Sequence, residues 1–404
     1  VKVVEANADS IQHKLGQPMA VKTALVRRFR SGPYQELMTD NFREIESDSE
    51  IQVVVETIGG VDAAYDYTRR CLMAGKHVVT ANKQLVAEHG CELLELARQN
   101  HVNYLFEASV GGGIPILHPL TQCMAANRID EIYGILNGTT NFILTKMSQE
   151  GMEFSDALAL ATELGYAEAD PTADVEGYDA GRKIAIMASI AFNSRVTFSQ
   201  VYTEGITKIS ADDIRYAKEF GYVIKLLGVA RNVDGQIEVK VHPMLIDENH
   251  PLATVKDAFN AVFVHGDAMD DAMFMGRGAG EMPTASAVMG DIIDVMRDIV
   301  CDCCGRIGCS CYKKLYVKKI EETKSKFFLR IKAKDKTGVL ANIASVLGNN
   351  DVSIAQVVQK RRNSGVAELV IITDEVEEKN FNDAMAIFEG MSVISEIAGV
   401  IRVH

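Results

Sequence analysis

The sequence contains no long apolar segment. None of its apolar runs approaches the roughly 20 residues that span a bilayer, and the opening stretch VKVVEANADS carries two acidic residues where a signal peptide would have an apolar core. We therefore expect neither a membrane protein nor a secreted one, and place the chain in the cytoplasm. The eight cysteines in 404 residues are then expected to be reduced thiols.

The chain also lacks a net positive charge and the usual metal-binding spacings. The chain has 42 basic and 55 acidic residues and a net charge of −13, which disfavours binding to a phosphate backbone and so excludes nucleic acid as a partner. No H-E-x-x-H or comparable metal motif occurs. With 47% hydrophobic residues, the chain is long enough for two or three globular domains.

The first hundred residues lack a dinucleotide-binding motif although they alternate strands and helices. Strands are predicted at residues 19–27, 51–56, 76–80 and 102–106, and helices at residues 1–15, 61–74 and 85–100. This alternation favours a doubly wound parallel sheet. A Rossmann domain normally opens with a strand and a G-x-G-x-x-G turn, and neither precedes the first predicted helix. We therefore expect a Rossmann-like domain that is truncated at its start.

Acidic side chains are concentrated in residues 161–183, ATELGYAEADPTADVEGYDAGRK. Two glycines and a proline interrupt regular structure, so most of the acids are expected on a loop. A helix is predicted from Asp179, and Lys183 lies four residues later on the same face. This carboxylate and ammonium suit binding of a cationic amine and proton transfer at a hydroxyl or carbonyl. The alternative is a solvated loop with an ordinary surface ion pair.

The same stretch resembles the signature of homoserine dehydrogenase. The matching residues are Ala161, Gly165, Tyr166, Asp170, Pro171, Asp174, Val175, Gly177, Asp179 and Lys183. Similar segments elsewhere are TANK at residues 80–83, EASVGGGIP at 107–115, NGTTNFIL at 137–144 and GRGAGEMPTASAV at 276–288. The resemblance implies NADP- or NAD-dependent interconversion of L-homoserine and L-aspartate 4-semialdehyde, in the biosynthesis of threonine, methionine and isoleucine.

The resemblance also implies roles for individual residues. Lys183 would exchange the proton at the hydroxyl oxygen with support from Lys83, and Asp179 would position substrate or a catalytic water. The substrate-binding residues would be Glu168, which holds the substrate ammonium, Asp174, Thr139 and Asn137. The cofactor would be contacted by Thr57, Lys83 and Gly280, and Arg27 joins them because of its charge rather than the resemblance. A sodium ion would be held by Glu107, Val110, Gly112 and Ile114.

Several of these residues have a plainer interpretation. Arginines at 27, 28 and 30, where an acid would select NAD, favour the 2′-phosphate of NADP, but they also suit a solvated edge. The glycines at 111–113 suit a cation nest, yet from composition alone a hinge between domains is favoured. Asn137 can line a polar pocket or cap a helix. Lys83 is either a solvent-exposed lysine or, as its place after a strand favours, a functional one.

The middle of the chain predicts a mixed or antiparallel sheet. Strands are expected at residues 131–136, 223–229, 237–241 and 260–265, a helix at 202–220, and a glycine turn at 276–280 that leads into a helix at 281–300. The segment CDCCGRIGCSC at 301–311 holds five of the eight cysteines. It can bind a soft metal, but C-x-C is not the usual zinc spacing, so a linker with free thiols is favoured. The lysine-rich residues 312–326 are expected to continue an exposed linker.

The last eighty residues follow a β-α-β-β-α-β order, which is the ferredoxin-like motif. They resemble the ACT regulatory domain, which implies that a free amino acid, here threonine, binds at the first strand–helix turn. The residues concerned are Asp335, Gly338, Val339 and Leu340. The alternative is a docking or dimerisation module without a ligand.

These observations predict an α/β protein with four segments. They are a Rossmann-like nucleotide domain at 1–108 plus 281–300, an α+β substrate and dimerisation domain with a mixed sheet at 109–280, a Cys- and Lys-rich linker at 301–325, and a ferredoxin-like ACT domain at 326–404. We expect a homodimer or homotetramer. The alternative function is a catalytically inactive amino-acid sensor, in which only the ACT domain works.

Overall fold

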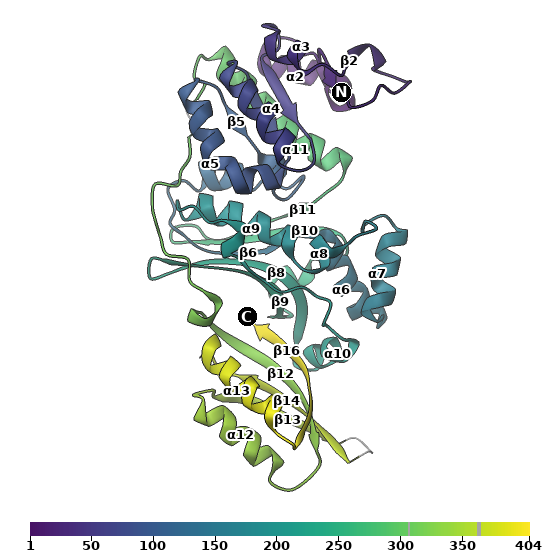
Figure 1. The fold of residues 1–404 in the computed structure, drawn as a ribbon, viewed down its shortest axis with the longest axis vertical. Coiled ribbons are helices and arrows are strands. Elements are labelled where there is room, and N and C mark those ends of the chain that lie inside the picture. Colours follow the sequence, from purple (N-terminus) through teal and green to yellow (C-terminus); the bar gives the residue numbers. More distant parts are fainter. Residues whose placement is uncertain (306–307, 362–364) are drawn as a thin grey trace. The chain divides into compact units, whose positions relative to one another are not determined.

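The computed structural model describes residues 1–305, 308–361 and 365–404 (Figure 1). The chain divides into two compact units. Unit 1 comprises Val1–Ala126, Ala185–Phe198 and Gly276–Lys314, and unit 2 comprises Asn127–Ile184, Ser199–Met275 and Leu315–His404. Among the described residues, no helix combines the length and apolar character needed to cross a membrane.

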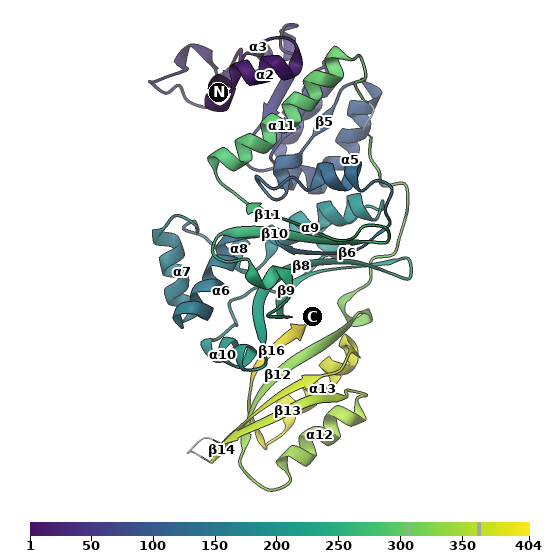
Figure 2. The same ribbon diagram turned by 180° about the vertical axis from the view of Figure 1, so that it is seen from behind.

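Unit 1 is built on a three-stranded parallel sheet. Its strands, in order, are β3 (Val53–Glu56), β4 (His77–Thr80) and β5 (Tyr104–Leu105). Helices α4 (Asp62–Met73) and α5 (Lys83–Gln99) lie on one face and α11 (Glu281–Val300) on the other, as the two opposite views show (Figures 1 and 2). All residues of β4 are buried, because helices cover both faces of this central strand. The predicted Rossmann-like arrangement is confirmed.

Helix α11 joins unit 1 from far along the sequence, where the glycine turn and helix were predicted. Its stripe of Val288, Met289, Ile292 and Val295 packs in one core with Val79 of β4. Burying an apolar side chain of this size stabilises a fold by about 1.5–3 kcal/mol, so this stripe fixes the helix to the sheet.

The remaining elements of unit 1 are short. They are α1 (Lys2–Ala6), α2 (Ala8–Leu15), β1 (Ala24–Leu25), η1 (Gln35–Leu37), β2 (Met38–Thr39), α3 (Phe42–Ser47), η2 (Glu107–Ser109) and η3 (Pro119–Cys123). The predicted single helix at 1–15 is wrong, because Asn7 leaves the helical region with φ −123° and separates α1 from α2. The predicted strand at 19–27 is reduced to β1, since only two residues pair with β2.

Unit 2 contains one eleven-stranded mixed sheet. Its main path runs β11, β10, β6, β8, β9, β16, β12, β14, β13, with β7 beside β9 and β15 beside β12. The strands are β6 (Ile129–Ile135), β7 (Tyr202–Thr203), β8 (Tyr222–Val233), β9 (Gln236–Asp247), β10 (Phe259–Gly266), β11 (Asp270–Arg277), β12 (Lys324–Lys334), β13 (Ile354–Arg361), β14 (Val366–Thr373), β15 (Val376–Glu377) and β16 (Ile394–Val403).

Its helices include α6 (Gly138–Glu150), α7 (Phe154–Glu163), α8 (Thr172–Val175), α10 (Ala211–Glu219), α12 (Val339–Asn349) and α13 (Glu378–Gly390), together with η5 (Pro251–Thr254) and η6 (Ile320–Glu322). Helix α9 (Tyr178–Ala191) begins in unit 2 and ends in unit 1, and η4 (Phe198–Gln200) crosses the next boundary. The predicted helix at 202–220 is wrong at its start. Ser210 and Asp213 form a capping box that begins α10 at Ala211, and β7 precedes it.

The ferredoxin-like motif is present, and its sheet is continuous with the rest of unit 2. Helices α12 and α13 pack on one face of β12 and β14 through a core that includes Leu329, Ile343 and Phe388 (Figure 2). Strand β16 pairs in parallel with β9 through Arg402 opposite Met244 and Val403 opposite Leu245. The sequence pattern did not predict this pairing.

Two buried arginines reinforce the junction between the ferredoxin-like strands and the rest of unit 2. Arg330 of β12 donates to Asp213 of α10 (2.9 Å) and to Glu368 of β14 (3.0 Å). Arg402 of β16 donates to both carboxylate oxygens of Glu378 (2.6 and 2.7 Å) and to Glu204 (2.8 Å). These arginines each join acidic residues from separate elements, so their loss removes a counter-charge from buried carboxylates.

The residues before β12 are less exposed than the predicted linker. Thr323 and Ser325 are buried, and the hydroxyl of Ser325 donates to Glu378 (2.8 Å) and accepts from Lys240 (3.0 Å). The expectation of an exposed segment up to residue 326 is therefore wrong at this end, because these side chains belong to the buried ionic network of Arg402.

We predict that Arg330→Ala lowers the free energy of unfolding by about 3–5 kcal/mol, because it removes the guanidinium that pairs with two buried carboxylates. Lys332→Ala is the matched control on the same strand. Its partner Glu396 is exposed, so the loss should stay below about 1 kcal/mol. Urea unfolding followed by circular dichroism measures both, and equal losses would contradict the role assigned to Arg330.

Candidate active site

The acidic stretch places a buried ion pair at the start of α9. The Nζ of Lys183 donates to Oδ2 of Asp179 (2.6 Å) and to the carbonyl of Leu136 (2.7 Å). Only 8% of Lys183 and 3% of Asp179 are exposed. The alternative of an ordinary surface pair is therefore wrong, because such pairs are solvated.

Asn137 connects this pair to a second carboxylate. Its side-chain amide donates to Asp174 (2.7 Å) and to Asp179 (2.9 Å), and its carbonyl oxygen accepts from the backbone N–H of Thr140 (2.9 Å). Asn137 thus caps α6, as one interpretation predicted, and its amide also contacts both carboxylates. We call Asn137, Asp174, Asp179 and Lys183 the lysine–carboxylate cluster.

The cluster carries two carboxylates for one ammonium. Burial raises the pKa of Asp174, and the charge of Asp179 raises it further, while hydrogen bonds from Asn137 and Thr139 and the charge of Lys183 act in the opposite direction. Ionisation of this half-buried carboxylate therefore costs free energy, and another cation close by would reduce that cost.

The loop between α7 and α8 involves two other predicted substrate residues, Thr139 and Glu168. The hydroxyl of Thr139 donates to the carbonyl of Tyr166 (2.7 Å), which fastens the loop between α7 and α8 to the start of α6. Glu168 follows on that loop and is exposed. Within the described part of the chain, no hydrogen bond joins Glu168 to the lysine–carboxylate cluster.

In unit 1, the loops after β3 and β4 are bound to each other. The amide of Asn82 donates to the carbonyls of Ile58 (2.9 Å) and Gly60 (2.7 Å), and the carboxylate of buried Glu56 accepts from the hydroxyl of Thr80 (2.5 Å). Burial raises the pKa of Glu56. Glu56 and Asn82 were not predicted from the sequence. Their position at the carboxyl ends of parallel strands, where ligands bind in such sheets, was the available signal.

A cavity of about 490 Å³ lies beside these loops at the N-terminus of α11. It is lined by Val55, Thr57, Gly280, Glu281, Thr284, Ala285 and Val288. Two predicted cofactor residues, Thr57 and Gly280, therefore share one cavity. The other two are not among its lining residues: Lys83 is half-buried at the start of α5, and Arg27 is exposed after β1.

The two glycine clusters of the sequence lie against each other in unit 1. A Cβ added to Gly112 would lie 2.4 Å from the carbonyl oxygen of Gly278, and one added to Gly113 would lie 2.9 Å from Cβ of Pro283. Gly112 also has φ +57°, a conformation that favours glycine. Close backbone approach therefore explains these glycines, and sequence reasoning did not connect the two clusters.

The residues proposed for sodium surround the same turn. The carboxylate of Glu107 accepts backbone N–H groups from Ile116 (2.5 Å), Leu117 (2.9 Å) and His118 (2.7 Å). Burial raises the pKa of Glu107, and these hydrogen bonds oppose the rise. Val110 and Ile114 are buried on the turn itself.

The residues proposed for an effector begin α12. Gly338 has φ +87° at the N-cap and Val339 is buried, whereas Leu340 is 39% exposed. Asp335 is exposed, and its backbone N–H donates to the carbonyl of Gly365 (2.9 Å).

Known proteins match the chain along its whole length. Family models described as homoserine dehydrogenase, as homoserine dehydrogenase NAD binding domain and as ACT domain match residues 115–293, 3–107 and 327–390. Homoserine dehydrogenases of Bacillus subtilis and Neisseria gonorrhoeae are 39% and 41% identical over 410 and 412 residues, covering 100% of this chain and 95% and 94% of the relatives.

Among solved structures, a homoserine dehydrogenase from Thiobacillus denitrificans has a TM-score of 0.93 at 40% identity, covering 100% of this chain and 94% of that one. The chain belongs to the homoserine dehydrogenase family. A hyperthermophilic archaeal homoserine dehydrogenase in complex with NADPH has a TM-score of 0.55 at 29% identity, covering 63% of this chain and 74% of that one.

Membership in the homoserine dehydrogenase family confirms the predicted function and fold class. The protein is an oxidoreductase that interconverts L-homoserine and L-aspartate 4-semialdehyde, it uses a nicotinamide dinucleotide, and it has an ACT domain. The matches cover the nucleotide-binding and catalytic regions as well as the ACT domain, so the alternative of an inactive sensor is not favoured.

We predict that Gly112→Ala lowers the free energy of unfolding by more than about 2 kcal/mol, since the new methyl group meets backbone atoms and the residue keeps a positive φ. Gly290→Ala is the control. Gly290 lies inside α11 with open space around it, and alanine there should stabilise the protein by about 0.5–1 kcal/mol. Thermal unfolding measures both. A stable Gly112→Ala would contradict the close packing of the two loops.

Proposed function

We propose that Lys183 is the group that donates and accepts the proton at the hydroxyl oxygen of homoserine. An ammonium carries three N–H groups, and among the described residues those of Lys183 have two acceptors, Asp179 and the carbonyl of Leu136. The third is available for a substrate oxygen. This arrangement is the observation that carries the proposal, because a group within hydrogen-bonding reach is the first requirement of acid–base catalysis.

The neighbours of Lys183 would hold the amino-acid part of the substrate. The lysine–carboxylate cluster has a net charge of −1 when its carboxylates are ionised, so it attracts the substrate ammonium. Asp174 would provide the nearby charge, Glu168 would bind the ammonium from the loop, and Thr139 would fix that loop. Asp179 and Asn137 would orient Lys183 and a catalytic water.

The cofactor supplies the hydride chemistry, and the residues of unit 1 would bind and orient it. Thr57 and Gly280 share a cavity at a helix N-terminus, where backbone N–H groups favour an anionic phosphate. Lys83 and Arg27 would add positive charge, with Lys83 also supporting catalysis. We favour NADP over NAD, because exposed arginines follow β1 and a structural relative binds NADPH.

A sodium ion is also proposed, at Glu107, Val110, Gly112 and Ile114. A buried carboxylate on a turn with consecutive positive φ at Gly111 and Gly112 suits a hard cation that takes oxygen ligands. Glu107 can provide an oxygen while its backbone hydrogen bonds hold it in place.

We also propose a homodimer or homotetramer that works in the cytoplasm. Strands β11 and β13 end the large sheet, and Met275 and Val357 on them are exposed apolar residues of the kind that an interface covers. All eight cysteines are free thiols, as a reducing compartment favours.

Lys183→Met should lower kcat for homoserine oxidation by a factor of about 10²–10⁴ and leave NADPH binding unchanged, because the hydroxyl proton then has no acceptor. Lys146→Met is the control. It removes an i,i+4 pair with Glu150 on α6 that is partly exposed, so kcat should stay within about twofold. Steady-state kinetics measure kcat, and a fluorescence titration measures NADPH binding. Undiminished turnover of Lys183→Met would exclude the assigned role.

The KM for homoserine should rise as the pH falls through the raised pKa of Asp174. Above that pKa the carboxylate attracts the substrate ammonium, and below it the neutral acid does not. Asp174→Asn should raise the KM about 10–100-fold at neutral pH and remove this acid-side change. Asp156→Asn, on the exposed start of α7, should retain the wild-type profile. A KM in the Asp174→Asn enzyme that still follows the wild-type pH curve would refute the proposal.

Threonine should bind the ACT domain, raise the melting temperature and lower activity. At one hundred times its Kd, a ligand stabilises the folded state by about 2.7 kcal/mol. Asp335→Ala should remove both responses while basal turnover is unchanged. Asp383→Ala, on the exposed side of α13, should keep them. A threonine response that survives in Asp335→Ala would place the effector elsewhere.

A further inference from the structure

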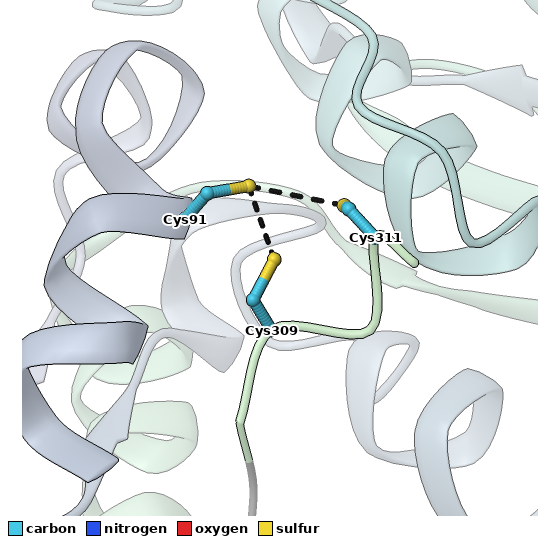
Figure 3. A group of neighbouring side chains, drawn as sticks. All are labelled: Cys91, Cys309 and Cys311. Carbon is cyan, nitrogen blue, oxygen red and sulfur yellow. Dashed lines mark hydrogen bonds between the residues drawn. The ribbon is translucent and has the colours of Figure 1, made fainter. Parts of the chain in front are cut away.

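Three cysteine side chains from two distant segments meet in unit 1 (Figure 3). Cys91 lies on α5, and Cys309 and Cys311 lie on the segment that follows α11. The Sγ of Cys91 is 3.1 Å from that of Cys309 and 3.8 Å from that of Cys311, and all three sulfur atoms lie within 4.8 Å of one another. Figure 3 shows the three thiols directed toward a common point.

The sequence favoured a linker with free thiols, because C-x-C alone is not a usual zinc spacing. The fold brings a third cysteine next to two of the five clustered ones. Cys309 and Cys311 lie beside Cys91, which precedes Cys309 by 218 positions. Metal-binding sites need ligands that converge in space, and the spacing along the chain matters only through that convergence.

We propose that Cys91, Cys309 and Cys311 form a three-thiolate site for a thiophilic metal ion, with Zn²⁺ as the expected occupant. With Zn–S bonds of about 2.3 Å and a tetrahedral arrangement, neighbouring sulfur ligands lie roughly 3.8 Å apart. The distance from Cys91 to Cys311 has this value, and the other two require only small side-chain movements. Thiolate ligands select soft or borderline ions over Mg²⁺ and Ca²⁺.

One positive charge lies close to the proposed site. The Arg195 guanidinium is near enough to Cys91 to act on the charge of its sulfur. The guanidinium of Arg195 donates to the main-chain carbonyl of Glu88 on α5 (2.7 Å). Three thiolates and a divalent ion carry a net charge of −1, and the guanidinium offsets it.

A fourth ligand position is available to water or to the nearby main chain. The carbonyl oxygen of Ser189 lies 3.8 Å from the Sγ of Cys311. In the bound state, each cysteine loses its thiol proton to solvent and forms one bond to the metal, so no oxidant is required.

The bound ion would act as a clip inside unit 1. It would join α5, which begins at Lys83 beside the candidate cofactor loops, to the segment after α11, whose N-terminus lines the cavity. Because the ligands are far apart in sequence, such a clip removes much chain freedom from the unfolded state. The site is thus structural, and its loss should change stability more than chemistry.

The test measures metal in the full-length protein, purified without an affinity tag or chelator and equilibrated with Zn²⁺ before gel filtration. Elemental analysis should find about one zinc per chain in the wild type, and less than about 0.2 in Cys91→Ser and in Cys309→Ser. Cys123→Ser and Cys301→Ser remove exposed thiols and should keep the wild-type content. Equal zinc in all five proteins would overturn the proposal.

A second measurement avoids reliance on the variants. The wild type loaded with Co²⁺ should show a near-ultraviolet thiolate-to-cobalt band that Zn²⁺ abolishes, and zinc should raise its melting temperature. Titration of the denatured, metal-free protein should find eight thiols. Six thiols would instead indicate a disulfide, which requires the sulfur atoms of Cys91 and Cys309 to close from 3.1 Å to about 2.05 Å, and would overturn the metal assignment.

Discussion

The candidate site depends on burying one ammonium without leaving it unsatisfied. A charge as enclosed as that of Lys183 is tolerated only when partners replace the water it loses. Asp179 supplies the countercharge from the same helix, and the carbonyl of Leu136 comes from the end of β6. Asn137 then fixes the carboxylate and caps α6 at the same time. The strand, the cap and the helix are therefore positioned by one set of hydrogen bonds.

In unit 1, close packing of two glycine-containing turns positions the elements around the candidate cofactor cavity. The turn that contains Gly112 and the turn at Gly278 contact each other through main-chain atoms, and this contact sets where α11 begins. The N-terminus of α11 in turn lines the cavity that contains Thr57 and Gly280. The candidate cofactor cavity is thus lined by segments separated by more than 200 positions.

The sequence predicted those features that depend on local pattern. The helix at 281–300, the buried strand β4 and the shared face of Asp179 and Lys183 follow from periodicity and i,i+4 spacing, which act within a few residues. It did not predict contacts that depend on chain reversal over long distances. The pairing of β16 with β9, the link from Asn137 to Asp174 and the approach of Cys91 to Cys309 have no local signal. The helix break at Asn7 was missed because it is confined to the backbone angles of one residue.

The parallel pairing of β16 with β9 has a consequence for how the chain tolerates shortening. Strand β16 covers main-chain groups of β9, a strand at the middle of the large sheet. A chain shortened so that it lacks β16 would leave that stretch of β9 without this neighbour and Glu378 without Arg402. An open strand edge recruits other chains, so incomplete copies would tend to aggregate and be degraded.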